Sequence, residues 1–124
     1  MKTTKHHFEM FKAECEKWIE RFGMFGWRYY YQHEDLKEGS QIAYCFYPEE
    51  PTDRVFTLGL SINLQNLQET ELDIRRSAFH EVMESFLFRM NYLAKARYIQ
   101  PEEINEENHH IIRTLENVVF TQRP

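Results

Sequence analysis

The chain has few cysteines and no long apolar run, and each shortage excludes a class of protein. Its two cysteines, Cys15 and Cys45, lie far apart and form no C-x-x-C motif, which favours free thiols in a reducing compartment over a disulfide framework. No stretch approaches the roughly 20 apolar residues that a membrane-spanning helix needs. The N-terminal segment also lacks the uninterrupted apolar region of a secretory signal. We therefore expect a cytoplasmic protein without a membrane partner.

Basic residues are fewer than acidic ones, and the formal net charge is -5. Binding to a phosphate backbone relies on Lys and Arg, so the net charge argues against wholesale electrostatic binding to nucleic acid but leaves room for a local basic patch. Hydrophobic residues make up 42% of the chain, which is enough for a packed core, but 124 residues are too few for two such cores. The sequence predicts a single domain, residues 1–124.

Apolar residues recur at helical spacing in three segments. The first helix is predicted to end at Gly23, and its stripe is Phe8, Phe11, Cys15, Trp18 and Phe22. A long helix is predicted from Glu71 to about Lys95, with a buried stripe of Phe79, Met83, Phe86, Met90 and Ala94. The last helix is predicted to begin at Pro101, with a stripe of Ile104, Ile111, Leu115 and Val118.

Three segments between the first and second helices have the character of strands. Residues 27–32 are rich in aromatics, while residues 41–47 and 55–64 alternate apolar and polar side chains. The connections hold Gly, Pro and Asp, which suit turns, so a mostly antiparallel meander is the simplest topology. The predicted order is helix, three strands and two helices, an α+β domain.

The pentad His80-Glu81-Val82-Met83-Glu84 is close to the helical zinc motif H-E-x-x-H. Residues four apart lie on the same side of a helix, so His80 and Glu84 can reach one ion, and both types of side chain bind zinc. Glu81 lies beside them, where the motif's glutamate holds and deprotonates a metal-bound water. The same spacing also suits an ordinary ion pair on a helix surface.

A zinc site needs a third protein ligand, and the last helix carries four candidates. These are Glu106, Glu107, His109 and His110, which would approach the motif if the last two helices packed antiparallel. Both histidines fall at the flanks of the helix's apolar stripe, so periodicity does not choose between them. The two Glu-x-x-His spacings also match carboxylate-bridged di-iron bundles, but the three predicted strands argue against a four-helix bundle.

The segment RRSAFHEVMESFLFRM, together with ARYIQPEEINEENHHIIRTLENVVF, resembles small bacteriophage and prophage proteins with a zincin-like metallopeptidase fold. The resemblance is most specific over residues 74–120. It implies that His80 and Glu84 are metal ligands, that Glu81 is the general base, and that His109 is the third ligand. It also implies an edge strand that binds extended substrate, expected here from residues 55–64. The chain departs from the usual pattern at Glu84, which replaces a second histidine.

The resulting hypothesis is a zinc-dependent hydrolase, specifically a peptidase acting on a peptide or protein in the cytoplasm of a bacterial host cell. Another divalent metal would also suit the ligand set. An alternative is a non-catalytic phage accessory protein that uses the zincin scaffold to bind another protein. A further alternative is an acidic interaction protein that binds no metal.

Overall fold

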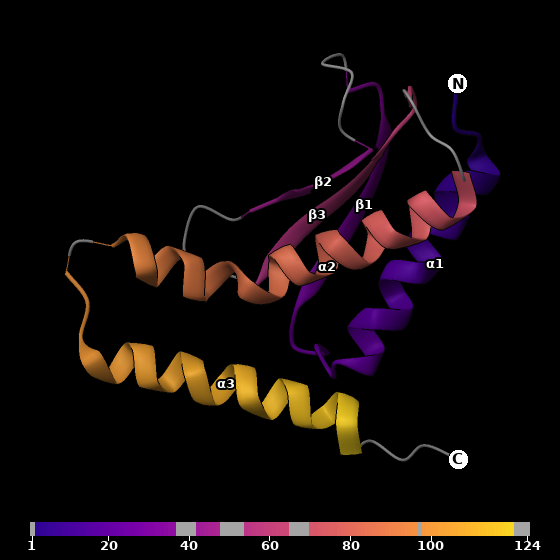
Figure 1. Ribbon diagram of the computed structural model, residues 1–124. Helices are drawn as coiled ribbons and strands as arrows, with labels where there is room; N and C mark the ends of the chain where they lie inside the picture. Colours follow the sequence, from indigo (N-terminus) through magenta and orange to yellow (C-terminus); the bar gives the residue numbers. More distant parts are fainter. Residues whose placement is uncertain (1, 37–41, 48–53, 65–69, 97, 121–124) are drawn as a thin grey trace.

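The computed structural model describes residues 2–36, 42–47, 54–64, 70–96 and 98–120 (Figure 1). Its elements follow the predicted order. They are α1 (Lys5–Arg21), β1 (Arg28–Glu34), β2 (Ala43–Phe46), β3 (Val55–Ser61), α2 (Thr70–Lys95) and α3 (Pro101–Phe120). The α+β class is confirmed, with three helices and a small mixed sheet of three strands. The predicted strand at 41–47 is confirmed for 43–46, and position 41 lies outside the described residues.

Helix α1 is closed by local signals at both ends. At its start, Thr4 Oγ1 accepts a hydrogen bond from the His7 amide, and the Thr4 amide donates to His7 Nδ1. At its end, Gly23 adopts a left-handed φ of 69°, and the amides of Gly23 and Met24 donate to the carbonyls of Glu20 and Ile19. This is the Schellman arrangement, which favours glycine at that position. The prediction that Gly23 ends the helix is confirmed.

The sheet has the order β1-β3-β2, so the predicted meander was wrong. Strand β3 is central, running parallel to β1 and antiparallel to β2. One of the two pairings is therefore parallel, because β1 and β2 form opposite edges and β3 returns from β2 into the position between them. The prediction that residues 55–64 supply the edge strand was also wrong, since this segment contains the central strand and the edges are β1 and β2.

Helices α1 and α2 cover one face of the sheet, and the core lies between them (Figure 1). The fully buried side chains at its centre come from α1, β3 and α2, and include Phe11, Leu58, Leu60, Ile74 and Val82. The Cys15 thiol approaches the Ala78 carbonyl to 3.8 Å, which brings α1 close to α2. The opposite face of the sheet carries more polar side chains, including Gln32 and Glu34 of β1.

The buried line of α2 differs from the predicted stripe. It runs through smaller residues, Ile74, Ala78, Val82 and Ser85, which allow α1 and the sheet to approach closely. Of the predicted stripe, Phe86 is buried, Met83 and Met90 are half-buried, and Phe79 and Ala94 are exposed. The helix is therefore rotated relative to the prediction, so the side of α2 that carries Glu81 turns toward the sheet.

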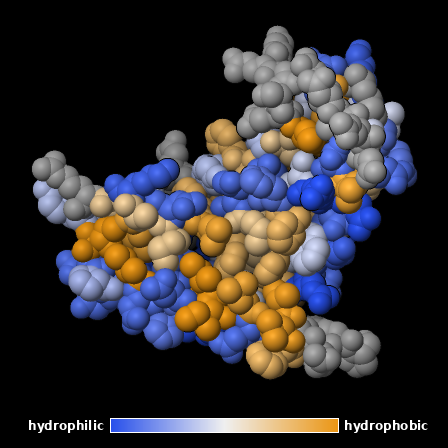
Figure 2. All heavy atoms as spheres, viewed as in Figure 1, coloured by the Kyte–Doolittle hydropathy of each residue, from blue (hydrophilic) through white to orange (hydrophobic). Residues whose placement is uncertain are grey.

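Helix α3 lies alongside α2, and its last turns approach the end of α1 (Figure 1). There the Asn117 side-chain amide donates to the Phe22 carbonyl, at 3.2 Å. Of its predicted stripe, Ile111 and Val118 pack on the core, but Ile104 and Leu115 are exposed. Figure 2 shows apolar surface continuing from the middle of α2 onto the C-terminal half of α3. Within the described ranges, no helix is both long enough and apolar enough to cross a bilayer.

The central strand contains Gly59, and a larger residue there is expected to weaken the fold. Gly59 pairs with Tyr44 of β2, whose ring crosses it so that the hydroxyl donates to Gln32 on β1. A Cβ at Gly59 would lie 2.0 Å from Tyr44 Cε1. We expect Gly59→Ala to displace the ring and to lower the free energy of unfolding by about 1–3 kcal/mol, measured by urea denaturation. Gly26→Ala is the control, because a Cβ there meets nothing within 4 Å. Equal losses in both variants would contradict this explanation.

Candidate functional site

The side chains of His80 and Glu84 lie together on α2, as their spacing predicted. The atoms His80 Nε2 and Glu84 Oε1 are 3.3 Å apart. The side chains are 67% and 36% exposed, so the pair lies on the surface of the helix. The second carboxylate oxygen of Glu84 accepts a hydrogen bond from the hydroxyl of Tyr47, the residue that follows β2. This bond holds the pair beside the sheet.

The separation within this pair suits two ligands of one ion as well as an ion pair. Two atoms about 2.1 Å from a tetrahedral ion lie roughly 3.4 Å from each other. The observed distance between His80 Nε2 and Glu84 Oε1 is 3.3 Å. As an ion pair alone, two such exposed groups contribute only about 0.5 kcal/mol. His80 and Glu84 therefore fit two of the three protein ligands that a catalytic zinc site uses.

Glu81 lies one helical step from the pair but is buried, with 9% of the residue exposed. Burial raises the pKa of its carboxyl to about 7, and the charge of Glu84 raises it further while His80 opposes the shift. The oxygens of Glu81 are not among the side-chain atoms of the described residues that are buried without a hydrogen-bond partner. Burial disfavours the charged form of the carboxylate, so Glu81 is a stronger base than an exposed glutamate.

Two thiols lie near Glu81, that of Cys15 on α1 and that of Cys45 on β2. Burial raises the pKa of both thiols well above the usual range, and the charge of Glu81 raises it further. A protonated thiol is a poor nucleophile and a poor metal ligand. The cysteines therefore act as packing residues, and of these three groups only Glu81 has a pKa near neutrality.

Strand β2 lies at the edge of the sheet, next to the His80–Glu84 pair. Its outer side pairs with no other strand among the described residues. Helix α2 packs against β2, and the rings of Tyr47 and Phe88 stack with centroids 4.9 Å apart. The exposed pair, the buried carboxylate of Glu81 and a free strand edge therefore converge on one part of the surface.

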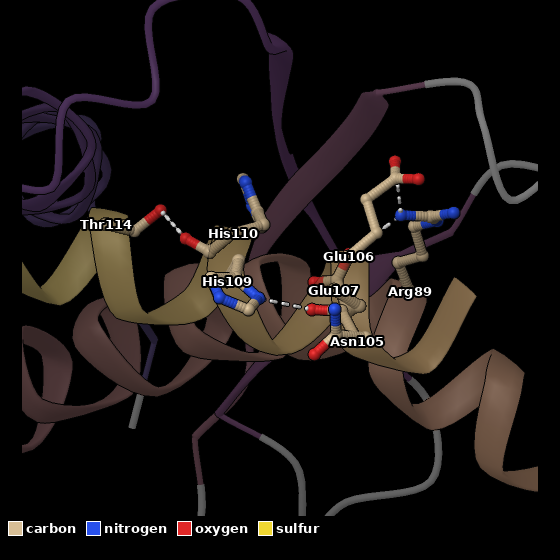
Figure 3. A network of polar contacts seen from close by, with 7 residues as sticks. All are labelled: Arg89, Asn105, Glu106, Glu107, His109, His110 and Thr114. Carbon is tan, nitrogen blue, oxygen red and sulfur yellow. Dashed lines mark hydrogen bonds and ion pairs between the residues drawn. The ribbon is translucent and has the colours of Figure 1, made fainter. Parts of the chain in front are cut away.

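The four candidate ligands on α3 have other partners (Figure 3). His109 is exposed, and its Nδ1 lies 2.8 Å from the Asn105 carbonyl on the same helix. His110 leaves α3 in a different direction and packs between the rings of Trp27 and Phe86. Successive residues on a helix differ by about 100° in direction, which explains why one histidine turns to solvent and the next one inward.

Glu106 and Glu107 both pair with Arg89 of α2, at 3.4 Å and 3.2 Å. Glu107 is only 1% exposed, and its Oε2 atom is buried without a hydrogen-bond partner among the described residues. Arg89 was not identified from the sequence. Its role depends on the rotation of α2, which brings Arg89 to the acidic residues of α3 and which the predicted stripe did not indicate.

The structure therefore assembles part of the predicted metal site. It brings His80 to Glu84 and places Glu81 beside them. It does not bring His109, or the other three candidates on α3, to this pair, and no three His, Cys, Asp or Glu side chains within the described ranges are placed to hold one metal ion. Tyr47 is a further residue of the site that the sequence did not indicate, since its contact with Glu84 depends on how β2 packs against α2.

The chain was compared with known proteins at three levels. Protein-family models, curated proteins and solved structures gave no match.

Proposed function

We propose that this protein is a metal-dependent peptidase of zincin-like fold, of the bacteriophage or prophage type, which acts in the cytoplasm of the bacterial host. The observation that supports the proposal is the position of Glu81, a buried carboxylate between the exposed His80–Glu84 pair and the free edge of β2. An apolar residue would pack there at a lower cost in stability. Groups that break packing rules in this way are concentrated at functional sites.

In this proposal His80 and Glu84 hold the ion, which is zinc because imidazole and carboxylate ligands both suit it. The bound ion would polarise the scissile carbonyl and lower the pKa of a water molecule. Glu81 would accept the proton of that water and pass one to the leaving amine. The burial that raises the basicity of Glu81 suits this role, and the hydrogen bond from Tyr47 would orient Glu84.

The substrate in this proposal is an extended peptide or protein segment that pairs with β2. A free strand edge offers unpaired backbone donors and acceptors, and an added strand satisfies them. The substrate-binding edge strand in this proposal is β2, and not residues 55–64 as the sequence predicted. Its position next to Glu84, through Tyr47, would bring the scissile bond of such a peptide near Glu81.

Metal binding tests the proposal directly. Protein purified without a histidine tag is expected to bind about one equivalent of zinc, measured by elemental analysis and by titration. His80→Ala and Glu84→Ala should each weaken binding by more than roughly 100-fold, because changes outside the ligand set already cost 10- to 100-fold. His6→Ala, an exposed histidine on α1, is the matched control. Absence of stoichiometric binding by the wild type would contradict the proposal.

The third ligand is tested separately, with His109→Ala. The family resemblance assigns this role to His109, and a loss as large as that of His80→Ala would support it. The arrangement of α3 described above predicts no loss, because the His109 imidazole contacts Asn105 instead of the pair. An unchanged affinity would therefore remove His109 from the ligand set.

A non-catalytic accessory protein on the same scaffold is the second candidate, and the position of α3 favours it. With Glu106 and Glu107 paired to Arg89 and His110 packed on Trp27, the metal site lacks its third ligand among the described residues. In this case the protein would bind another protein without cleaving it. An unchanged biological effect of Glu81→Gln would favour this candidate over the peptidase.

A further inference from the structure

A groove between α1 and α2 is separate from the β2 side of the candidate site. It is an open groove with a volume of about 550 Å³. Its apolar lining comes from Trp18 of α1 and from Leu72, Phe79 and Met83 of α2. The rings of Trp18 and Phe79 meet edge to face, with centroids 4.9 Å apart. A pocket of this size, lined by aromatic and aliphatic side chains, is the usual setting for a bound apolar group.

The apolar lining is only partly covered by the protein itself. Leu72 is 44% exposed and Phe79 is 37% exposed, although both are large apolar residues. Their neighbour Trp18 has its indole nitrogen satisfied, because it donates to Glu14 Oε2 at 2.7 Å. A bulky apolar side chain laid on this surface would remove more apolar area from water without leaving a polar atom unpaired.

The rim of the groove is basic, in contrast to the chain as a whole. Arg75 and Arg76 line it, together with Glu14 and His80. Glu14 is already engaged, since it accepts hydrogen bonds from Trp18 and Arg75 and pairs with Lys17. Arg76 forms no ion pair with any described residue. Arg75 contacts Glu14 through its Nε atom alone. Each guanidinium therefore keeps donors that can face a carboxylate.

We propose that the α1–α2 groove binds an acidic segment of a protein partner. A bulky apolar side chain of that segment would lie on Trp18 and Phe79, and its carboxylates would pair with Arg75 and Arg76. The two cations match acidic residues, while the apolar lining requires a side chain that a phosphate backbone does not offer. The overall charge of -5 also disfavours nucleic acid as the occupant. The proposal does not depend on metal binding or peptidase activity.

Fluorescein-labelled peptides test this inference, using full-length protein in the presence of a chelator. The probe is an acidic peptide in which Glu residues flank a central Phe and Leu. It should bind with an affinity that falls as salt is raised, and it should alter Trp18 fluorescence. The double variant Arg75→Gln, Arg76→Gln and the single variant Phe79→Ala should each weaken binding by at least about 10-fold. Arg28→Gln, an exposed arginine on β1, should not.

Two control peptides make the test specific. Replacing Glu by Lys removes the charge match, and replacing Phe and Leu by Ala removes the apolar group, so each should abolish binding. Circular dichroism confirms that the variants are folded, and Leu72→Ser provides a second change in the lining if Phe79→Ala is unstable. The inference is overturned if no acidic peptide binds, if the Lys peptide binds equally well, or if only fatty-acid vesicles bind. It is also overturned if the folded groove variants retain full affinity.

Discussion

Glu81→Gln is expected to remove peptide hydrolysis while making the folded protein more stable. As the proposed general base, Glu81 contributes roughly 10²- to 10⁴-fold to the rate, and glutamine cannot accept the proton. The same substitution removes a buried carboxylate whose charged form is disfavoured by burial. Loss of activity through unfolding would lower stability, so opposite changes in rate and stability identify a functional group.

The kinetic part of this experiment compares Glu81→Gln with Glu84→Gln under saturating zinc. The first variant should keep its metal and lose turnover, whereas the second should lose metal affinity, because Glu84 is a proposed ligand. Cleavage of a peptide library, followed by mass spectrometry, measures the rate whichever peptide sequence is cut. Undiminished cleavage by metal-loaded Glu81→Gln would show that another group takes the proton.

The effect of Glu81→Gln on the free energy of unfolding is expected to depend on pH in the metal-free protein. The pKa of Glu81 is raised by burial from its usual 4.5 to about 7, so the folded state binds this proton more tightly than the unfolded state. Stability from this group is therefore present below pH 4.5 and is lost as the pH rises to about 7. Urea denaturation in chelator should show Glu81→Gln gaining roughly 2 kcal/mol over the wild type between about pH 5 and pH 8. Parallel pH profiles for the two proteins would contradict the assigned burial.

The helices and the order of elements were predictable because their signals are local. The stripe of α1 and its closing Gly23 lie within a few turns of each other, and the structure confirms both. The sheet topology was not predictable in the same way. Alternation in residues 55–64 indicates a strand but contains no information about its neighbours, and the parallel pairing of β1 with β3 joins segments more than 20 residues apart.

In the candidate site, too, the local features were predictable and the long-range contacts were not. The approach of His80 to Glu84 follows from the geometry of one helix, so sequence spacing was sufficient. The third ligand depends on how α3 is rotated against α2, and a difference of one residue exchanges an inward side chain for an outward one. His110 is the inward histidine and His109 the outward one. The rotation of α2 that buries Glu81 depends on small residues such as Ala78, which carry little weight in a hydrophobic pattern.

Replacing Arg89 is expected to destabilise the protein, because it leaves the buried carboxylate of Glu107 without its partner. Arg89→Met removes the charge but retains much of the apolar stem, so the change acts mainly on the carboxylate of Glu107. That carboxylate is 1% exposed and pairs with Arg89 at 3.2 Å. Breaking a buried pair from one side leaves an uncompensated charge, and the expected cost is about 3 kcal/mol at pH 8.

The companion variants determine whether the cost comes from the buried charge. Glu106→Gln should change stability by less than about 1 kcal/mol, because Glu106 makes its ion pair with Arg89 in solvent. Adding Glu107→Leu to Arg89→Met should recover most of the lost stability, since the double variant leaves no charge to compensate. The penalty of Arg89→Met alone should shrink as the pH is lowered, because burial raises the pKa of Glu107 and allows the carboxyl to take up a proton. If the double variant is no more stable than Arg89→Met, then α3 is held to α2 by packing around His110 and Trp27 rather than by this pair.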